Sequence, residues 1–378
     1  MNPIRTVGHT SGRVSSLKFK KNYHLHIRHN GRGAEPINQH CPGDEAKLEF
    51  ESVAWENGVM QNNRVNRRKF LGGVAGMLAV GVASPLWLNA APKRASGKSV
   101  RLGGPVFDPP GDPDKLARAH RLMGYRAAYC PNIPIKDGAL IRSFEDAFAR
   151  EDVVIAEVGR WVNLMDANPE KRQKNLETVI EGLALADAIG ARCCVDIAGS
   201  FSPESWFGPH PRNFSREHFD ASVENARKII DAVKPKRAKF CYEMMGWAWP
   251  HSPEAGVKLI RAVDRKGFGA HLDPCNLINS PEKFYDNTAL LNESFDKLGK
   301  WIVSCHAKDL AWEVELNLHF KEVIPGRGRL DYATYLRRVS QLPQNTPLML
   351  EHLNGAGEYQ EARNYIFAAG KTAGVCFD

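Results

Sequence analysis

Lys239-Phe240-Cys241-Tyr242-Glu243 is a short apolar stretch that ends in a carboxylate. Three later stretches repeat this pattern: 269–273 (GAHLD), 302–306 (IVSCH) and 347–351 (PLMLE). Each is typical of a buried strand with a polar side chain near its carboxyl end, and helix-length segments separate them. In a closed parallel barrel the carboxyl ends of all strands meet at one mouth. The pattern therefore brings together Glu243, Asp273, His306 and Glu351.

Three carboxylates and one imidazole at one point form an oxygen-rich site that suits a hard divalent cation. The simpler alternative is four unrelated polar residues that happen to end four strands. Carboxylates in a mouth of low dielectric repel one another and are costly to leave unpaired. Because a bound cation removes this repulsion, we expect one divalent metal ion held by these four residues.

Eight strand-like stretches alternate with helix-like stretches from residue 100 onward. We predict an α/β fold, a (β/α)8 TIM barrel, as a single domain after an N-terminal leader. A doubly wound open sheet is the alternative, but no glycine-rich phosphate fingerprint follows the first strand. The predicted strands are 100–102, 125–130, 153–158, 192–197, 238–244, 268–273, 301–306 and 348–352. The predicted helices are 113–123, 139–150, 169–189, 215–233, 253–265, 281–298, 332–341 and 358–373.

The chain of 378 residues has a net charge of +8. Residues 1–90 hold 12 Lys and Arg against 6 Asp and Glu, a net of +6, and the rest holds 39 against 37, a net of +2. Because the excess lies mostly in the leader, we predict no nucleic-acid binding. Six cysteines in or beside predicted strands form no CxxC pair, which indicates buried thiols in a domain folded in a reducing compartment. They are Cys130, Cys193, Cys194, Cys241, Cys275 and Cys305.

The stretch 66–71 (NRRKFL) contains paired arginines and precedes an uncharged run over 71–88. Small residues at 88–91 (LNAA) suit peptidase cleavage. These features resemble a twin-arginine signal peptide. We expect the twin-arginine translocase as a partner during export, a periplasmic location and no stable membrane span after cleavage. An uncleaved anchor is the alternative, although the glycines and Pro85 weaken a spanning helix.

A twin-arginine signal normally lies near the N-terminus, but here 59 residues precede Met60. We therefore expect that the natural start is Met60 and that residues 1–59 are either a mis-annotated stretch upstream of it or a disordered extension. Residues 60–90 are then the signal peptide, 91–99 a linker and 100–378 the barrel. The twin-arginine route carries folded proteins, which agrees with a barrel that takes up its metal before export.

Five short motifs carry a family resemblance: 242–245 (YEMM), 271–274 (HLDP), 306–309 (HAKD), 350–353 (LEHL) and 325–332 (PGRGRLDY). On these motifs the chain resembles the sugar isomerase and epimerase branch of the xylose isomerase-like barrels. The resemblance implies that Glu243, Asp273, His306 and Glu351 bind one Mn, Mg, Co or Zn ion. It also implies that Glu243 and Glu351 act as the acid/base pair.

One position departs from that family. Many members have a histidine three residues after the aspartate that matches Asp273, where it contacts the substrate, and this chain has Asn276. An asparagine still donates a hydrogen bond, but it carries no proton at neutral pH. The departure argues against a standard ketose epimerase substrate more than against the metal.

Further side chains near the strand ends are candidates for contact with the substrate. Each has an alternative: Glu157 pairs with Arg160, His271 supports the core, Lys308 neutralises Asp309, and the tryptophans fill loops. An arginine in the 325–332 turn either binds an anionic group or is solvated. The candidate substrate residues are Glu157, Trp161, Trp247, His271, Asn276, Lys308 and Arg327.

These observations predict an isomerase or epimerase of a small unphosphorylated carbohydrate, because an exported enzyme does not meet cytoplasmic sugar phosphates. One glutamate removes a proton next to a carbonyl, the metal stabilises the enediolate, and the other glutamate returns the proton. A 3-keto-glycoside lyase uses the same residues and is the main alternative. A DNA-repair endonuclease and a non-catalytic sugar-binding barrel are weaker ones, and the sequence leaves a homo-oligomer open.

Overall fold

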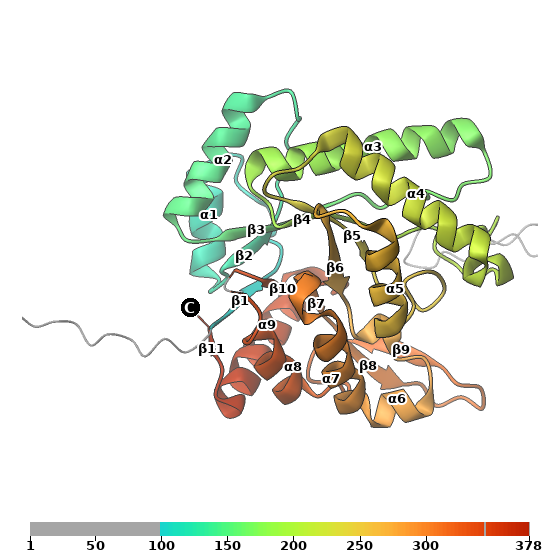
Figure 1. The fold of residues 1–378 in the computed structure, drawn as a ribbon. Coiled ribbons are helices and arrows are strands. Elements are labelled where there is room, and N and C mark those ends of the chain that lie inside the picture. Colours follow the sequence, from blue (N-terminus) through green and yellow to red (C-terminus); the bar gives the residue numbers. More distant parts are fainter. Residues whose placement is uncertain (1–98, 344, 378) are drawn as a thin grey trace, which may run out of the picture. The chain divides into compact units, whose positions relative to one another are not determined.

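Eight parallel strands form a closed barrel in the computed structural model, which describes residues 99–343 and 345–377. The barrel closes because β10 pairs with both β7 and β1. Helices surround the strands (Figure 1), so the predicted (β/α)8 TIM barrel is confirmed. The barrel strands are β1 (Ser99–Gly103), β2 (Ala127–Tyr129), β3 (Val154–Gly159), β4 (Cys193–Asp196), β5 (Lys239–Glu243), β6 (Phe268–Leu272), β7 (Ile302–Ala307) and β10 (Pro347–Leu350).

Several helices begin at a side-chain cap, and several end at a glycine. Asn168 and Ser215 accept backbone N–H bonds at the starts of α3 and α4, and Gly190 ends α3 with a φ of 77°. The helices are α1 (Pro113–Leu122), α2 (Gly138–Arg150), α3 (Pro169–Ile189), α4 (Arg216–Val233), α5 (Pro253–Val263), α6 (Pro281–Tyr285), α7 (Asn287–Leu298), α8 (Tyr332–Val339) and α9 (Gly355–Ala373). Short 3-10 turns are η1 (Pro211–Phe214), η2 (Cys275–Leu277) and η3 (Gly299–Trp301).

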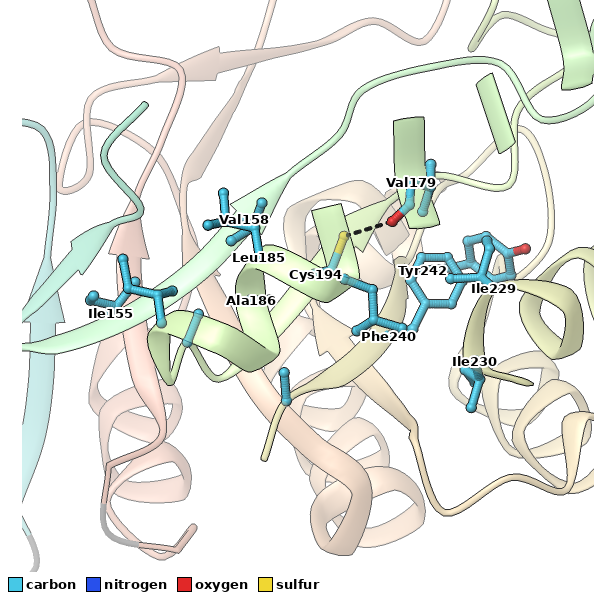
Figure 2. Close-up of a cluster of buried hydrophobic side chains, with 14 of the residues drawn as sticks. Ile155, Val158, Val179, Leu185, Ala186, Cys194, Ile229, Ile230, Phe240 and Tyr242 are labelled. Carbon is cyan, nitrogen blue, oxygen red and sulfur yellow. Dashed lines mark hydrogen bonds between the residues drawn. The ribbon is translucent and has the colours of Figure 1, made fainter. Parts of the chain in front are cut away.

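The strand β4 shows how the core divides. Cys193 packs with Cys241 inside the barrel, whereas Cys194 points out toward the helices. Figure 2 shows Cys194 beside Val179 of α3 and Phe240 in the same cluster. The Cys194 sulfur lies 3.9 Å from the carbonyl oxygen of Val179. The cysteines that the structure describes are free thiols; of the six expected to be buried, five are, and Cys130 is half-buried.

Three elements differ from the prediction. The single helix expected over 281–298 is two helices, because the side chain of Asp286 accepts from the N–H of Ala289 and starts α7 anew. The segment between β7 and α8, expected to be a loop, contains an antiparallel hairpin of β8 (Asp309–Trp312) and β9 (Phe320–Val323). Phe320 stacks on Phe284 of α6, and Figure 1 shows the hairpin beside this helix. A short β11 (Cys376–Phe377) pairs with β1.

The predicted extension (1–59), signal peptide (60–90) and most of the linker (91–99) lie outside the described residues. Within 99–343 and 345–377, no helix is long and apolar enough to cross a membrane.

Candidate metal centre and pocket

Four strands bring the predicted ligands together at the carboxyl end of the barrel. Glu243 ends β5, Asp273 follows β6, His306 lies in β7 and Glu351 follows β10. The Nδ1 atom of His306 lies 2.9 Å from Glu243 Oε1, 3.0 Å from Glu351 Oε2 and 3.7 Å from Asp273 Oδ2. Each of the four side chains offers one ligand atom, and these atoms all lie within 4.8 Å of one another.

The free oxygen atoms of this cluster fit a divalent cation. Asp273 Oδ2 and Glu351 Oε2 accept no well-aligned hydrogen bond from the described residues. Their nearest positive charge is the ammonium group of Lys308, whose Nζ lies 2.8 Å from each. Three carboxylates with one imidazole nitrogen are a normal donor set for Mg²⁺, Mn²⁺ or Zn²⁺. One lysine leaves this group of carboxylates negative, so a cation has both ligands and an electrostatic reason to bind.

The two glutamates of the cluster differ in their affinity for a proton. Burial raises the pKa of Glu243 above its usual value, although His306 and Lys308 oppose the rise. Burial would also raise the pKa of Glu351, but the charges of His306 and Lys308 lower it below its usual value.

Glu157 lies inside the barrel, on the other side of His306 from the cluster. Its carboxylate is buried and accepts three hydrogen bonds, from His271 Nε2 at 2.8 Å, Ser304 Oγ at 3.0 Å and His306 Nε2 at 3.2 Å. Burial would raise the pKa of Glu157, but His271 and His306 lower it, so the group is ionised. An anionic acceptor at Nε2 leaves the Nδ1 lone pair of His306 free to face a cation.

The Pro-Gly-Arg-Gly turn has a structural role that its sequence alone does not show. The carboxylate of Asp309 accepts backbone N–H bonds from four residues, and those of Gly326 and Gly328 lie at 2.9 and 3.0 Å. A Cβ on Gly328 would lie 2.2 Å from Asp309 Oδ1, so the close approach requires glycine. Arg327 in this turn forms an exposed ion pair with Glu361.

A cavity of about 480 Å³ adjoins the cluster. Its lining includes polar side chains, among them the two glutamates of the cluster. The apolar side chains of the lining come mainly from the loops after β3 and β4. The polar lining residues are Glu243, Asn276, Lys308, Glu322, Glu351 and His352, and the apolar ones are Trp161, Ile197, Trp206, Phe207 and Met245.

The hairpin and the end of β10 each supply one polar lining residue that the sequence analysis missed. Glu322 of β9 accepts from His352 Nδ1 at 2.9 Å and lies 3.7 Å from Lys308 Nζ. His352 has a φ of 58°, which is unusual for a residue other than glycine. No local pattern marks Glu322, whereas His352 follows Glu351 directly.

The structure places the predicted substrate residues in three groups. Trp161, Asn276 and Lys308 line the cavity, and Asn276 Nδ2 donates to Glu243 Oε1 at 3.1 Å. The buried side chains of Glu157 and His271 lie behind His306, inside the barrel. Trp247 and Arg327 are not among the residues that line this cavity.

Comparisons with known proteins agree with this fold. Residues 118–369 match the model of the xylose isomerase-like TIM barrel family, and the chain belongs to this family. A comparison with curated protein sequences gave no significant match.

Three solved structures show how varied the proteins with this fold are. A xylose isomerase-like TIM barrel protein from Mycobacterium smegmatis in complex with magnesium has a TM-score of 0.53 at 19% identity, over 73% of this chain and 97% of that one. The 3-keto-D-glucoside 4-epimerase of E. coli has a TM-score of 0.52 at 13% identity, over 71% and 100%. Endonuclease IV from Thermus thermophilus has a TM-score of 0.53 at 16% identity, over 72% and 99%. At these identities the likeness shows the fold alone.

Proposed function

We propose that this protein is a divalent-metal-dependent isomerase or epimerase of an unphosphorylated sugar. The observation that carries the proposal is the position of Glu243 and Glu351, which lie together at the candidate metal cluster and both line the cavity. Two carboxyl groups at one cation site are what proton removal and return next to a carbonyl require. A fold-family resemblance to sugar epimerases supports the same class of reaction.

The residues of the site have separate roles in proton transfer and in cation binding. Glu243 and Glu351 exchange a proton with the substrate carbon, and Asp273 and His306 complete the set that would hold the cation. When bound, the cation would supply the positive charge that stabilises an enediolate. Asn276 donates to Glu243 Oε1 and so orients this carboxyl group without taking part in proton transfer.

The charges of the cavity favour a neutral substrate. Of the residues that line it, Lys308 is paired with Asp273 and Glu351, and His352 is paired with Glu322. No other basic residue is among the lining residues, and three carboxylates face the cavity. Away from the proposed cation, a phosphate group would meet the carboxylate of Glu322 and no uncommitted basic side chain of the lining, so it would lose its hydration without compensation.

A 3-keto-glycoside lyase remains the second candidate, since it needs the same base and cation. Asn276 favours it, because the histidine that contacts ketose substrates in many family members is replaced. The two candidates differ in product: a lyase releases the group at C1, whereas an epimerase retains it.

Deuterium exchange tests the proposed function. The barrel, from residue 91 onward, is loaded with Mn²⁺ and incubated in deuterated water with free ketoses and with 3-keto-glycosides. Deuterium at the carbon next to the carbonyl in a rearranged sugar supports the isomerase or epimerase, and a released aglycone supports the lyase. Metal-loaded protein that exchanges no deuterium into any of these sugars contradicts both.

Export through the twin-arginine route to the periplasm is a separate proposal, supported by the paired arginines, the uncharged run and the small residues of 66–91. Sequencing the N-terminus of the precursor and of the exported form tests it. We expect Met60 and Ala91 as the respective first residues, and a precursor that begins at Met1 would contradict the proposed start.

A further inference from the structure

Three aromatic side chains line the cavity and follow β3 and β4, whereas the carboxylates of the lining belong to or follow β5, β9 and β10. Trp161 and Phe207 are 42% and 40% exposed, and Trp206 contacts Phe207 edge-to-face with ring centroids 5.4 Å apart. We call Trp161, Trp206 and Phe207, with Ile197 and Met245, the aromatic wall. Large apolar groups left open to water at a cavity mark a binding surface.

The local backbone holds the aromatic wall in place. The indole nitrogen of Trp161 lies 2.7 Å from where a Cβ of Gly159 would be, so a side chain at position 159 would displace the ring from this position. The buried side chain of Asn213 donates to the carbonyl groups of Gly208 and Trp247, at 3.1 and 3.0 Å, and so ties the loop after β4 to the loop after β5. A wall fixed in advance loses little conformational freedom when a ligand packs on it.

The cavity is larger than one sugar ring needs. A hexose occupies roughly 180 Å³, taken as six water volumes of about 30 Å³. The cavity measures about 480 Å³ and lies within the range of pockets for drug-sized ligands. A sugar at the carboxylates would therefore leave more than half of the cavity unfilled. The aromatic wall supplies five of the eleven lining residues, so an apolar group attached to the sugar suits the remaining space.

We propose that the substrate is a keto-glycoside whose flat, apolar aglycone packs on the aromatic wall while its sugar faces Glu243 and Glu351. This inference rests on the proposed function and narrows its substrate class. The anomeric carbon of a glycoside is an acetal, so the carbonyl group that activates the proton is a ring ketone. The proton leaves the carbon beside this ketone for one glutamate and returns from the other, with no net oxidation or reduction.

Binding of glycosides to the metal-loaded barrel tests the aromatic wall directly. The probes are phenyl and methyl glucosides, each in both anomers, measured by isothermal titration calorimetry. We expect one phenyl glucoside to bind roughly tenfold more tightly than its methyl counterpart, because the ring buries apolar area. Trp206→Ala and Phe207→Ala should each reduce this preference. Trp312→Ala is the matched control, since Trp312 is an exposed tryptophan of β8 outside the cavity lining.

Equal affinity for phenyl and methyl glucosides would overturn the inference, and so would a preference that survives Trp206→Ala and Phe207→Ala. The deuterium exchange assay reports on the proposed function independently. A phenyl preference without any deuterium exchange would support the aglycone site and contradict the proposed reaction. Deuterium exchange without a phenyl preference would support the proposed reaction and contradict the aglycone site.

Discussion

Two clusters of carboxylates with a histidine differ in how the chain holds them. The buried cluster draws Glu243, Asp273, His306 and Glu351 from four strands, and its side chains are at most 13% exposed. The hairpin cluster consists of Glu313, Glu315 and His319, which come from one turn and include side chains 53% and 57% exposed.

The difference teaches that similar ligand types do not make equal sites. In the buried cluster, backbone N–H groups fix Asp273, and Tyr335 donates to the carbonyl of His306 at 2.7 Å. In the hairpin, Lys321 already neutralises Glu313 at 2.8 Å, and water solvates the rest. A cation gains more at ligands that are prearranged and poorly hydrated, so we expect it at the buried cluster.

Removal of a proposed acid/base carboxyl group should have the largest effect. Glu351→Gln or Glu243→Gln should lower the exchange rate by roughly 100- to 10,000-fold, the usual contribution of a general acid or base. Glu361→Gln, at an exposed carboxylate paired with Arg327, is the control and should exchange normally. Rates near those of the wild type in either pocket variant would remove that residue from proton transfer.

Loss of a buried ligand should come next. Asp273→Ala should weaken Mn²⁺ binding by more than about 100-fold, because losing a metal ligand lowers metal affinity more than losing a residue that only hydrogen-bonds to a ligand. Asp273→Asn separates two roles: it keeps an oxygen that accepts from the N–H of Cys275 but loses the charge. We expect the Mn²⁺ affinity of Asp273→Asn, measured by competition with a chelator, to lie between those of the wild type and Asp273→Ala. Unchanged metal affinity in Asp273→Ala would refute the assignment.

Glu157, which accepts a hydrogen bond from His306, should affect Mn²⁺ affinity less than the metal ligands do. Glu157→Gln should lower Mn²⁺ affinity by about 10- to 100-fold, since the neutral amide no longer stabilises His306 as a ligand. Ser304→Ala removes one of three donors to Glu157 and should cost less. Nitrogen chemical shifts of His306 report its tautomer, and a purely structural role for Glu157 would leave them unaltered.

The smallest effect belongs to the hairpin cluster. The double variant Glu313→Gln, His319→Gln should bind Mn²⁺ and exchange deuterium like the wild type, because its side chains are solvated and Glu313 is already paired. A loss of bound metal in this variant, with the buried cluster intact, would mean that the cation binds at the hairpin cluster instead.

The sequence predicted what local patterns determine. Glu243 and His306 end apolar stretches, so alternation and strand order were enough to bring them together. The partners of Glu157 were not predictable, because His271 and Ser304 reach it across the barrel from β6 and β7. The hairpin was missed because Val314, Leu316 and Leu318 are exposed, so its alternation of apolar and charged residues marks no buried face. Glu322 was missed with it.

Anomalous X-ray scattering at the manganese absorption edge, from crystals grown with Mn²⁺, tests the central claim most directly. We predict one strong peak between the carboxylates of Glu243, Asp273 and Glu351 and the Nδ1 atom of His306. A peak only at the hairpin cluster, or no peak between these four side chains at saturating Mn²⁺, would contradict the account.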